Sequence, residues 1–535
     1  MPLVGRVGRK RPRARLAMVV LYFILAAGAL TTLYPFAIMA STGLKGPTDQ
    51  NTLDLVPAYL SDPAVLGEKY LDDKYSGNIS LIGATRLGAD ATPEEIAAYE
   101  RFLMSLPNEW WQAGFRTATT QVTSRLSLRY QAWLRSKYRT IQELNRAYIE
   151  ENVAFQTVSP PNELLERANW VPLPGKKIEE WQEFKRTLPA EFRIPMLGRR
   201  MWQEFLRSEF QNQIDAVPGL LRGDAKKFEE IAFEAQILEE ALPPSFRLRE
   251  EGGRGMESEL ASKFVRERLP ARYRNGKTVE DLWQSFIGRP GAVLPIAAYE
   301  AQFVQANAAE LRREFAGRNY RYILDYILIN GRAVWNTALF CLLAVLTQLI
   351  VNPLAAYVLS RYPIPAAGKI LLFLLATMAF PAEVAMIPSF LLLKDLGLLN
   401  TFAALVLPSA ASGYMIFLLK GFFDSLPREL YESGEIDGAK EVTLLWKIAL
   451  PLSKPVLGYL ALLAFMSAYG AFMYAFLVAQ DQRMWTLMVW IYQLQAVAPK
   501  AVMMAALTLA ALPTLVVFLL AQRVIMRGIV LPGER

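Results

Sequence analysis

The most informative stretch of this sequence is residues 426–451, which read LPRELYESGEIDGAKEVTLLWKIALP. Pro427 and Pro451 bracket it, and Asp437-Gly438 is a dipeptide typical of a break between helices. The pattern predicts two short helices joined by a turn. Uncharged runs, each long enough to cross a bilayer, precede and follow the stretch. It is therefore predicted to be a helical hairpin in a loop between two membrane spans.

Each of the two predicted helices has an apolar side. Glu432 and Glu435 are expected to be exposed on the first helix. A hairpin of this kind suits docking into a cleft of a soluble partner, and an ordinary amphipathic loop on the membrane surface is the alternative. The apolar residues are Leu430, Tyr431 and Ile436 in the first helix and Val442, Leu445 and Trp446 in the second.

The composition indicates an all-α membrane protein. Hydrophobic residues make up 53% of the 535 residues and charged residues 20%, and the mean hydropathy of +0.19 is high for a soluble protein. The first apolar run would extend about 43 Å as a helix, so a retained span is favoured over a cleaved signal peptide, whose apolar run is shorter. Six transmembrane helices are predicted, at residues 16–44, 333–360, 370–393, 396–419, 455–480 and 501–522.

The distribution of Lys and Arg predicts how these spans are oriented. If the N-terminus is inside, the short outer loops carry only Lys394, Arg483 and Lys500, and the other basic residues between the spans face the cytoplasm. Both termini are therefore predicted to be cytoplasmic. The expected division of the chain is 1–15 as a basic N-terminus, 16–44 as the first span, 45–332 as an extracytoplasmic insert, and 333–535 as a core with five spans and the cytoplasmic loop 427–455.

The insert is polar and large enough to form a core of its own. Thr92-Pro93-Glu94-Glu95, Thr140–Glu143 and Thr278–Asp281 have the form of capping boxes, and apolar residues recur at helical spacing from Leu126 to Tyr138. The insert is therefore predicted to be mostly helical. Seven of the 11 Trp lie in it; core packing is the favoured explanation, and a glycan-binding surface is the alternative. They are Trp110, Trp111, Trp133, Trp170, Trp181, Trp202 and Trp283.

Several kinds of chemistry are excluded by composition. The chain has no His and one Cys, which excludes Ser-His-Asp catalysis, zinc-histidine sites and an internal disulfide. Gly276-Lys277-Thr278 resembles the end of a P-loop, but Ala271 stands where its first Gly should be. We therefore expect no catalytic, cofactor or metal site, with ATP hydrolysed by another chain. The basic excess fits cytoplasmic loops, and no nucleic-acid partner is expected.

The hairpin resembles the EAA motif of ABC importer permeases. That motif reads Glu-Ala-Ala, two residues, Asp-Gly-Ala, eight residues, then Ile-x-Leu-Pro. Ser433 and Gly434 depart from the motif's Ala-Ala, and since Gly costs about 1 kcal/mol relative to Ala in a helix, a weaker first helix is expected. The resemblance implies contact with an ATPase subunit through Glu432, Ser433, Gly434, Asp437, Gly438, Ala439, Ile448, Leu450 and Pro451.

Other segments resemble the carbohydrate branch of that family, typified by the maltose importer. They include Tyr34-Pro35-Phe36, Trp335-Asn336-Thr337, Ala355-Ala356-Tyr357 and Ile387-Pro388-Ser389-Phe390. The resemblance implies the type I importer permease fold in the bacterial inner membrane. It also implies a sugar as solute, two copies of an ATP-binding subunit, a second permease subunit and an extracytoplasmic solute-binding protein. The second permease can be a different chain or another copy.

A few polar or aromatic residues in the spans are candidates for the translocation path. Glu383 is the only charge deep within a predicted span, and it either lines the path or makes a packing contact. Asn336 and Asn352 are explained by interhelical hydrogen bonds or by solute contact. Tyr469 and Phe472 belong to an aromatic stripe that either packs or stacks on sugar rings.

Two other functions compete with the importer permease. A membrane-anchored glycan-binding or glycan-processing protein would act through the insert, since a pair of carboxylates can hydrolyse glycosides without His. The insert lacks the strand–helix alternation of a barrel, however, and a simple anchor needs no hairpin of this kind. A secondary transporter would not need the hairpin either. Co-purification with an ATPase would separate these functions.

Overall fold

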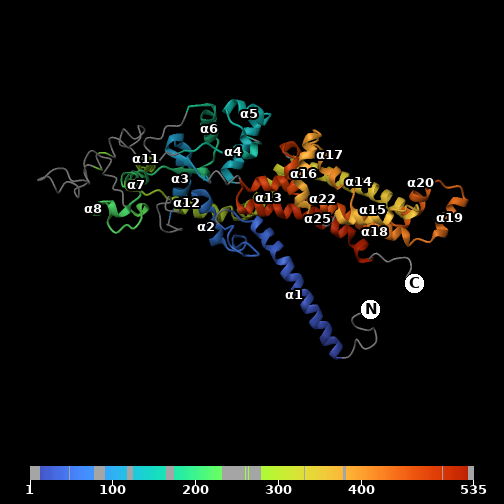
Figure 1. Cartoon of the computed structure of the whole chain (residues 1–535). Coiled ribbons are helices and arrows are strands. Elements are labelled where there is room, and N and C mark those ends of the chain that lie inside the picture. The colour runs from blue at the N-terminus through green and yellow to red at the C-terminus, as the bar shows by residue number, and fades with distance from the viewer. Residues whose placement is uncertain are drawn as a thin grey trace. The chain divides into compact units, whose positions relative to one another are not determined.

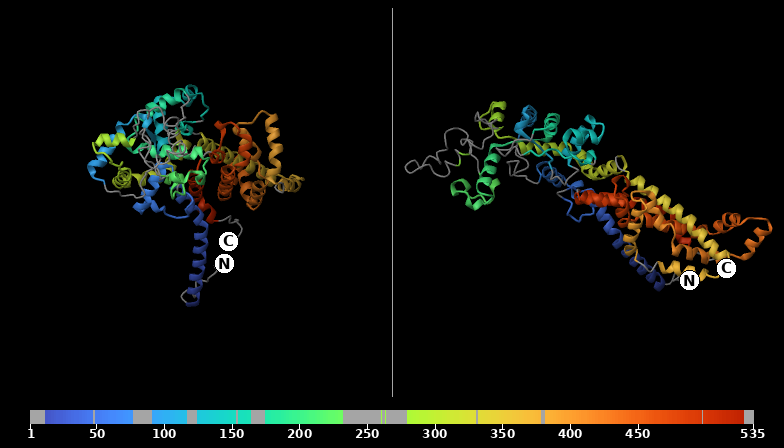
Figure 2. Two further views of the ribbon diagram at one scale, coloured as in Figure 1. Left: turned by 90° about the vertical axis from the view of Figure 1, so that its left-hand side faces the viewer. Right: turned by 45° about the horizontal axis from the view of Figure 1, so that its top comes forward.

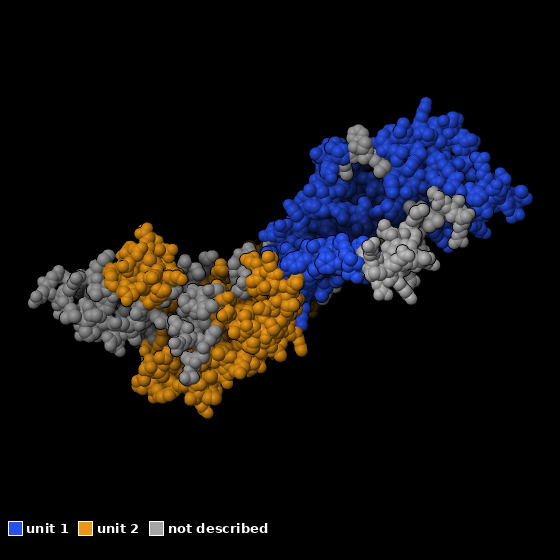
Figure 3. Space-filling view, turned by 90° about the horizontal axis from the view of Figure 1, so that it is seen from below, with its two compact units in different colours: residues 1–43, 320–535 blue, residues 44–319 orange. Residues whose placement is uncertain are grey.

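The computed structural model describes residues 12–46, 49–76, 91–116, 124–152, 154–163, 174–231, 260, 263, 279–329, 332–377, 381–496 and 498–527. The chain divides into two compact units. The first consists of Met1–Gly43 and Tyr320–Arg535, and the second of Leu44–Asn319 (Figure 3). Each unit has its own hydrophobic core and is described separately below.

The first unit consists of helices (Figure 1). Its helices are α1 (Pro12–Gly43), the end of α13 (Ala308–Leu324), α14 (Ala333–Arg361), α15 (Ala367–Ala376), α16 (Ala382–Asp395), α17 (Phe402–Val406), α18 (Gly413–Asp424), α19 (Arg428–Ile436), α20 (Glu441–Leu444), α21 (Leu450–Leu452), α22 (Lys454–Tyr469), α23 (Met473–Val478), α24 (Leu487–Gln495) and α25 (Lys500–Arg527). Short π- or 3-10 helices also occur, at Asp325–Ile329, Leu407–Ser409, Leu445–Ala449 and Gln482–Met484.

Within the described residues, three single helices are long and apolar enough to cross a membrane. They are Met18–Gly43, Ala333–Arg361 and Lys500–Gln522. Two bent pairs of helices raise the number to at most five. These pairs are Phe402–Ser409 with Gly413–Asp424, bent by 50°, and Glu441–Leu452 with Lys454–Tyr469, bent by 82°. The chain is thus mostly helical with three to five candidate spans, and the full set of six stays a prediction.

The predicted span at residues 370–393 is not one continuous helix. α15 ends at Ala376, and α16 begins at Ala382 after the N-cap residue Pro381, whose φ of −57° and ψ of 133° are not helical. Proline lacks the N–H that would continue a helix and disfavours helical backbone in the residue before it. A hydropathy pattern counts apolar side chains and therefore does not detect such a break.

α14 is the central helix of the first unit. It lies alongside α18 and α22 (Figure 1 and Figure 2), and α1 lies against α25. Small residues at these contacts, such as Ala356 and Ala464, let the helices approach closely. The same cluster of buried residues includes Tyr431, Leu444 and Leu445, so the inner side of the predicted hairpin is part of the core of this unit.

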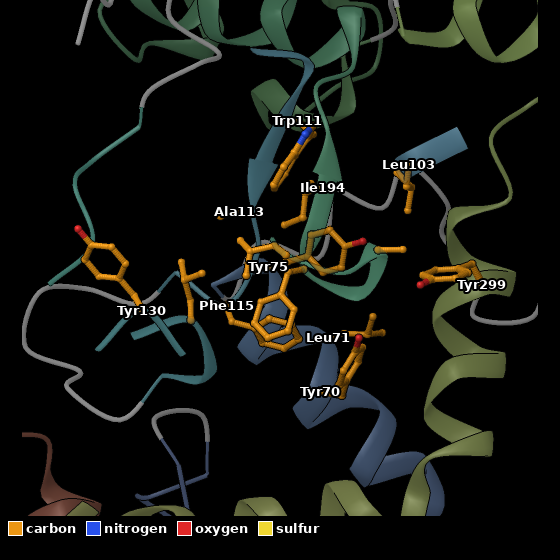
Figure 4. Close-up of a cluster of buried hydrophobic side chains, with 14 of the residues drawn as sticks. Tyr70, Leu71, Tyr75, Leu103, Trp111, Ala113, Phe115, Tyr130, Ile194 and Tyr299 are labelled. Carbon is orange, nitrogen blue, oxygen red and sulfur yellow. The ribbon is translucent and has the colours of Figure 1, made fainter. Parts of the chain in front are cut away.

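In its described residues, the second unit is mostly helical and has one small two-stranded sheet. β1 (Trp111–Ala113) pairs antiparallel with β2 (Arg193–Pro195), and Gln112 stands opposite Ile194 (Figure 4). Strands of three residues are too short to give an alternating pattern, and the sequence analysis missed them. The helices are α2 (Pro63–Tyr75), α3 (Pro93–Ser105), α4 (Arg125–Lys137), α5 (Ile141–Tyr148), α6 (Lys176–Arg186), α7 (Gly198–Glu209), α8 (Gly219–Arg222), α11 (Val279–Ile287), α12 (Ile296–Ala306) and the start of α13.

Tryptophan forms much of the core of the second unit. Trp111, Trp181, Trp202 and Trp283 are fully buried, so core packing is the correct explanation for these four. Trp110 and Trp133 are partly buried, and Trp170 lies outside the described residues. Trp202 belongs to a smaller second cluster formed by residues 196–231 and Leu260.

Of the three predicted capping boxes, the two that fall on described residues both stand at helix starts, one complete and one in part. Thr92 and Glu95 form both bonds of a capping box at the start of α3. Thr140 accepts from the Glu143 N–H, but the Glu143 carboxylate accepts from the N–H of Arg139 rather than that of Thr140. The third predicted box, with Thr278, lies outside the described residues, as does the P-loop-like fragment 276–278.

Candidate functional site: a braced helical hairpin

The predicted hairpin is present, and its turn has a defined geometry. α19 ends at Ile436, the N–H of Gly438 donates to the Glu435 carbonyl at 2.9 Å, and the N–H of Ala439 donates to the Gly434 carbonyl at 2.9 Å. These two bonds are those of a Schellman motif. Gly438 has a φ of +78°. A residue with a Cβ is strained in this conformation, so glycine fixes the direction in which the chain leaves α19.

The second part of the hairpin continues as one bent helical run. α20 is followed by a π-helix at Leu445–Ala449 and then by α21. Ile448 and Leu450 are partly buried, and Pro451 is exposed at the start of α21. π-helical turns are rare, occur mostly as single turns within α-helices, and are frequent at functional sites.

Gly434 lies at the contact between the two parts of the hairpin. A Cβ built on Gly434 would lie 2.5 Å from Cδ2 of Leu444 and 3.2 Å from Cδ1 of Ile448. The first distance is shorter than van der Waals contact, so an alanine here would have to displace Leu444. α19 is nevertheless continuous from Arg428 to Ile436, and the glycine leaves no break in it.

The hairpin is braced against the C-terminal end of α14. The Tyr357 hydroxyl donates to Oε2 of Glu441 at 2.7 Å. Arg361 forms an ion pair with Glu435, and its guanidinium lies 4.7 Å from the ring centroid of Tyr431. Burial raises the pKa of Tyr431, whose ring is 5% exposed. The sequence analysis missed these contacts, because the partners are about 70 to 85 residues apart in the chain.

The outer surface of the hairpin exposes three large apolar side chains. Ile436 is 86% exposed, Val442 67% and Trp446 62%. Tyr431 and Leu445, by contrast, are buried, so the predicted apolar residues divide between the core and the surface. Glu432 and Glu435 are exposed as expected, although Glu435 also pairs with Arg361, and Ser433 is exposed as well. Exposed apolar residues on a fixed support are typical of an interaction surface.

The asparagines predicted for the translocation path take part in packing. Asn336 donates to the carbonyls of Arg483 and Trp485 at 2.8 and 3.0 Å. Asn352 is fully buried, donates to the Gln348 carbonyl at 2.8 Å, and accepts from the N–H of Ser412 at 2.8 Å. The bond from Ser412, the N-cap of α18, is the interhelical hydrogen bond expected for Asn352, whereas its bond to Gln348 stays within α14. Asn336 joins α14 to the 3-10 turn at Gln482–Met484 and to Trp485, which follows it.

Glu383 does not lie in the interior of a continuous helix. It stands in the first turn of α16, directly after the break at Pro381, and it is exposed in the isolated chain. The N-terminal turn of a helix favours a carboxylate because its N–H groups are unpaired. Glu383 therefore stands at a helix start rather than inside a continuous helix, and its depth in a span and its place in the path stay predictions.

The aromatic stripe divides at the end of α22. Tyr469 stacks on Phe465 with 5.6 Å between ring centroids and donates to the Ala510 carbonyl at 2.6 Å. Both rings line a cavity of about 770 Å³ between α14, α22 and α25. Phe472 lies elsewhere and contacts Tyr492 at a centroid distance of 5.0 Å. The cavity wall carries two hydroxyl groups, and both are bonded to backbone: that of Tyr469 donates to the Ala510 carbonyl and that of Thr337 to the Ala333 carbonyl. The other lining residues are apolar. The cavity therefore lacks the converging polar groups that bind a sugar.

Comparisons with known proteins place these features in a family. Residues 325–530 match the model of the binding-protein-dependent transport system inner membrane component. Protein LplC of Bacillus subtilis is 30% identical over 274 residues, which covers 46% of this chain and 91% of that protein. The polygalacturonan/rhamnogalacturonan transport system permease protein YtcP of B. subtilis is 28% identical over 40% of this chain and 79% of that protein.

The sn-glycerol-3-phosphate transport system permease protein UgpE of Yersinia pestis is 30% identical over 204 residues, or 37% of this chain and 73% of that protein. The identity to LplC over nearly its whole length, together with the family match, is sufficient to assign the chain. This multi-pass membrane protein belongs to the family of inner membrane components of binding-protein-dependent transport systems.

Proposed function

We propose that this chain is the permease subunit of an ABC importer for a carbohydrate. In this proposal it forms part of the translocation path and couples it to a separate ATP-binding subunit present in two copies. A second permease subunit and an extracytoplasmic solute-binding protein complete the importer. The proposal follows from the family of the chain and from the resemblance of residues 432–451 to the EAA motif.

The observation that carries the proposal is the hairpin of α19 and α20. Its inner side joins the core next to α14, and its outer side exposes Ile436, Val442 and Trp446. The ATPase would contact this outer side, with Glu432 and the Gly438 turn at the contact. A movement of the ATPase would then be transmitted to α14 through the Tyr357–Glu441 and Arg361–Glu435 contacts.

A carbohydrate solute is supported by one relative that is named as a polygalacturonan/rhamnogalacturonan permease. It is also supported by the segments that resemble the maltose-importer branch. Glu383 is a candidate for contact with a sugar hydroxyl, because it is exposed in the chain alone and sits at a helix start. A glycan-processing or glycan-binding role for residues 45–332 is less favoured, since four of the tryptophans that suggested it are buried.

The proposed topology has both termini in the cytoplasm and residues 45–332 outside the bacterial inner membrane. In this arrangement the insert is a docking surface for the solute-binding protein or for the second permease. The test is cysteine labelling of intact cells after replacement of Cys341. Single cysteines at Thr140 and Ala225 should react with an impermeant reagent. Reaction only after permeabilisation would contradict this topology.

Gly438→Asp tests the coupling role. Nothing lies within 4 Å of a Cβ at Gly438, so the substitution adds bulk and charge to the outer surface and costs about 1–2 kcal/mol in backbone conformation. The variant should insert at normal abundance but lose transport, because the ATPase dissociates or no longer responds to the loaded binding protein. Gly288→Asp is the matched control, since Gly288 also has a positive φ (+70°) and open space around it. Normal transport by Gly438→Asp would remove the main support for the proposal.

A further inference from the structure

A short loop that follows the first span exposes three aliphatic side chains. Leu53 is 69% exposed, Leu55 51% and Val56 66%. Single exposed aliphatic residues are ordinary on a protein surface, but three within four residues form a patch. The loop comprises residues 49–57 and belongs to the second unit.

This loop is held in one conformation by Lys45. The Lys45 ammonium donates to the Thr52 carbonyl at 2.8 Å, to the Thr52 hydroxyl at 2.9 Å and to the Asp54 carbonyl at 3.1 Å. An ammonium group has three N–H donors, so all of them are used. Lys45 is 2% exposed. The first charged residue after the apolar run of α1 is therefore not directed to solvent but holds residues 52–54.

Two further side chains, those of Asp49 and Tyr59, hold the start of the loop and the residues that follow it. Asp49 accepts from the N–H of Gly46 at 2.6 Å and pairs with Lys69 of α2 at 2.5 Å. The Tyr59 hydroxyl donates to the Leu44 carbonyl at 2.8 Å. The exposed aliphatic residues thus lie on an ordered support, with both ends of the loop bonded back to the chain at residues 44–46.

The loop at residues 49–57 follows the end of α1 within a few residues of the chain. α1 ends at Gly43, and Lys45 follows two residues later. Because the Lys45 side chain bonds the Thr52 and Asp54 carbonyls, the backbone that carries the patch passes within about the length of one lysine side chain and a hydrogen bond of residue 45. α1 is a candidate membrane span whose apolar run ends at Leu44. The end of that run is where a span meets the lipid headgroups.

We propose that the loop at residues 49–57 is an interfacial anchor that inserts Leu53, Leu55 and Val56 into the lipid layer at the end of α1. An apolar surface that follows a span closely in the chain can bury its side chains at the boundary between headgroups and acyl chains. The anchor would fix the start of the second unit relative to the membrane surface. The inference requires that α1 spans the membrane, but it does not depend on the solute or on the ATPase.

The test uses the full-length chain in phospholipid vesicles, with Cys341 replaced by Ala. A single cysteine at Val56 carries an environment-sensitive fluorophore, and the vesicles contain phosphatidylcholine with a nitroxide near the top of one acyl chain. Two other positions are labelled in the same way for comparison. Ile149, an aliphatic residue of the second unit that is 92% exposed, reports a water-facing site, and Phe23 of α1, 72% exposed, reports the span itself.

The fluorophore at Val56 should be quenched by the labelled lipid at least about twofold more than the one at Ile149, and aqueous iodide should quench it less. Equal behaviour at Val56 and Ile149 would overturn the proposal. Protection of Val56 from both quenchers would also overturn it, because a protein partner would then cover the patch. Quenching by lipid at Phe23 establishes separately that α1 spans, so a negative result at Val56 concerns the loop alone.

Discussion

Tyr357→Phe removes a single hydroxyl and tests whether the brace between α14 and the hairpin transmits coupling. The Tyr357 hydroxyl donates to the Glu441 carboxylate at 2.7 Å, and Tyr357 is 4% exposed. A hydrogen bond to a charged group contributes about 1.5–3 kcal/mol when sheltered. Since 1.4 kcal/mol is a factor of ten in an equilibrium, the braced position of α20 should become about 10- to 100-fold less favoured over detached positions.

Tyr357→Phe should weaken the coupling of ATP hydrolysis to the loaded binding protein rather than the binding of the ATPase. The apolar outer surface of the hairpin is unchanged in Tyr357→Phe, so the ATPase should still co-purify. ATP hydrolysis in vesicles should respond to the loaded binding protein about tenfold less than in the wild type, if the detached positions do not transmit the movement. Tyr362→Phe is the matched control, because it makes the same change at a residue that is 44% exposed just after the end of α14.

Two outcomes would refute this reasoning. If the loaded binding protein stimulates ATP hydrolysis equally in the Tyr357→Phe and Tyr362→Phe variants, the brace has no part in coupling. If Tyr357→Phe instead loses the ATPase during purification, the hydroxyl acts on docking and not on transmission. Measuring the amount of bound ATPase and its stimulation in the same preparation distinguishes these outcomes.

Three further predictions concern the two units separately. A fragment of residues 44–319 should fold alone and give a helical circular dichroism spectrum, and a strand-dominated spectrum would contradict this. Glu300→Gln should lower the free energy of unfolding of that fragment by about 3 kcal/mol in a denaturant titration, because it leaves buried Lys74 without its counter-charge. An unchanged midpoint would show that the Lys74–Glu300 pair does not stabilise the fragment. The purified full-length chain should not hydrolyse ATP on its own, and activity free of any partner would contradict that prediction.

The sequence predicted the elements that depend on local pattern. The hairpin between Pro427 and Pro451 follows from helix breakers, and the start of α3 follows from Thr92 and Glu95. It did not predict where the apolar runs are interrupted. Pro381 and Ser412 each stand at a helix start inside or near such a run, and hydropathy averages over them. Local signals of this kind fix elements more reliably than they fix element boundaries.

Contacts between distant residues were beyond the reach of the sequence. The pattern favours a neighbouring helix over a solute as the partner of Asn352, but it does not show that the donor is Ser412, 60 residues away. Tyr357 was noticed only as part of a resemblance, while its role depends on Glu441 in another helix. A one-dimensional pattern shows that a polar group needs a partner in an apolar span, but the tertiary packing decides which partner it finds.

Gly434 shows how a departure from a motif is explained by packing. Considered alone, glycine weakens a helix by about 1 kcal/mol relative to the alanine of the EAA motif. In the folded hairpin, however, a Cβ at this position would lie 2.5 Å from Leu444, which is 1% exposed and has little room to move. Overpacking a core typically costs about 1–3 kcal/mol, so it can offset the gain in helix propensity. The glycine therefore permits a closer approach between the two parts of the hairpin than alanine would, and the Leu444 side chain occupies the space that the motif usually gives to a methyl group.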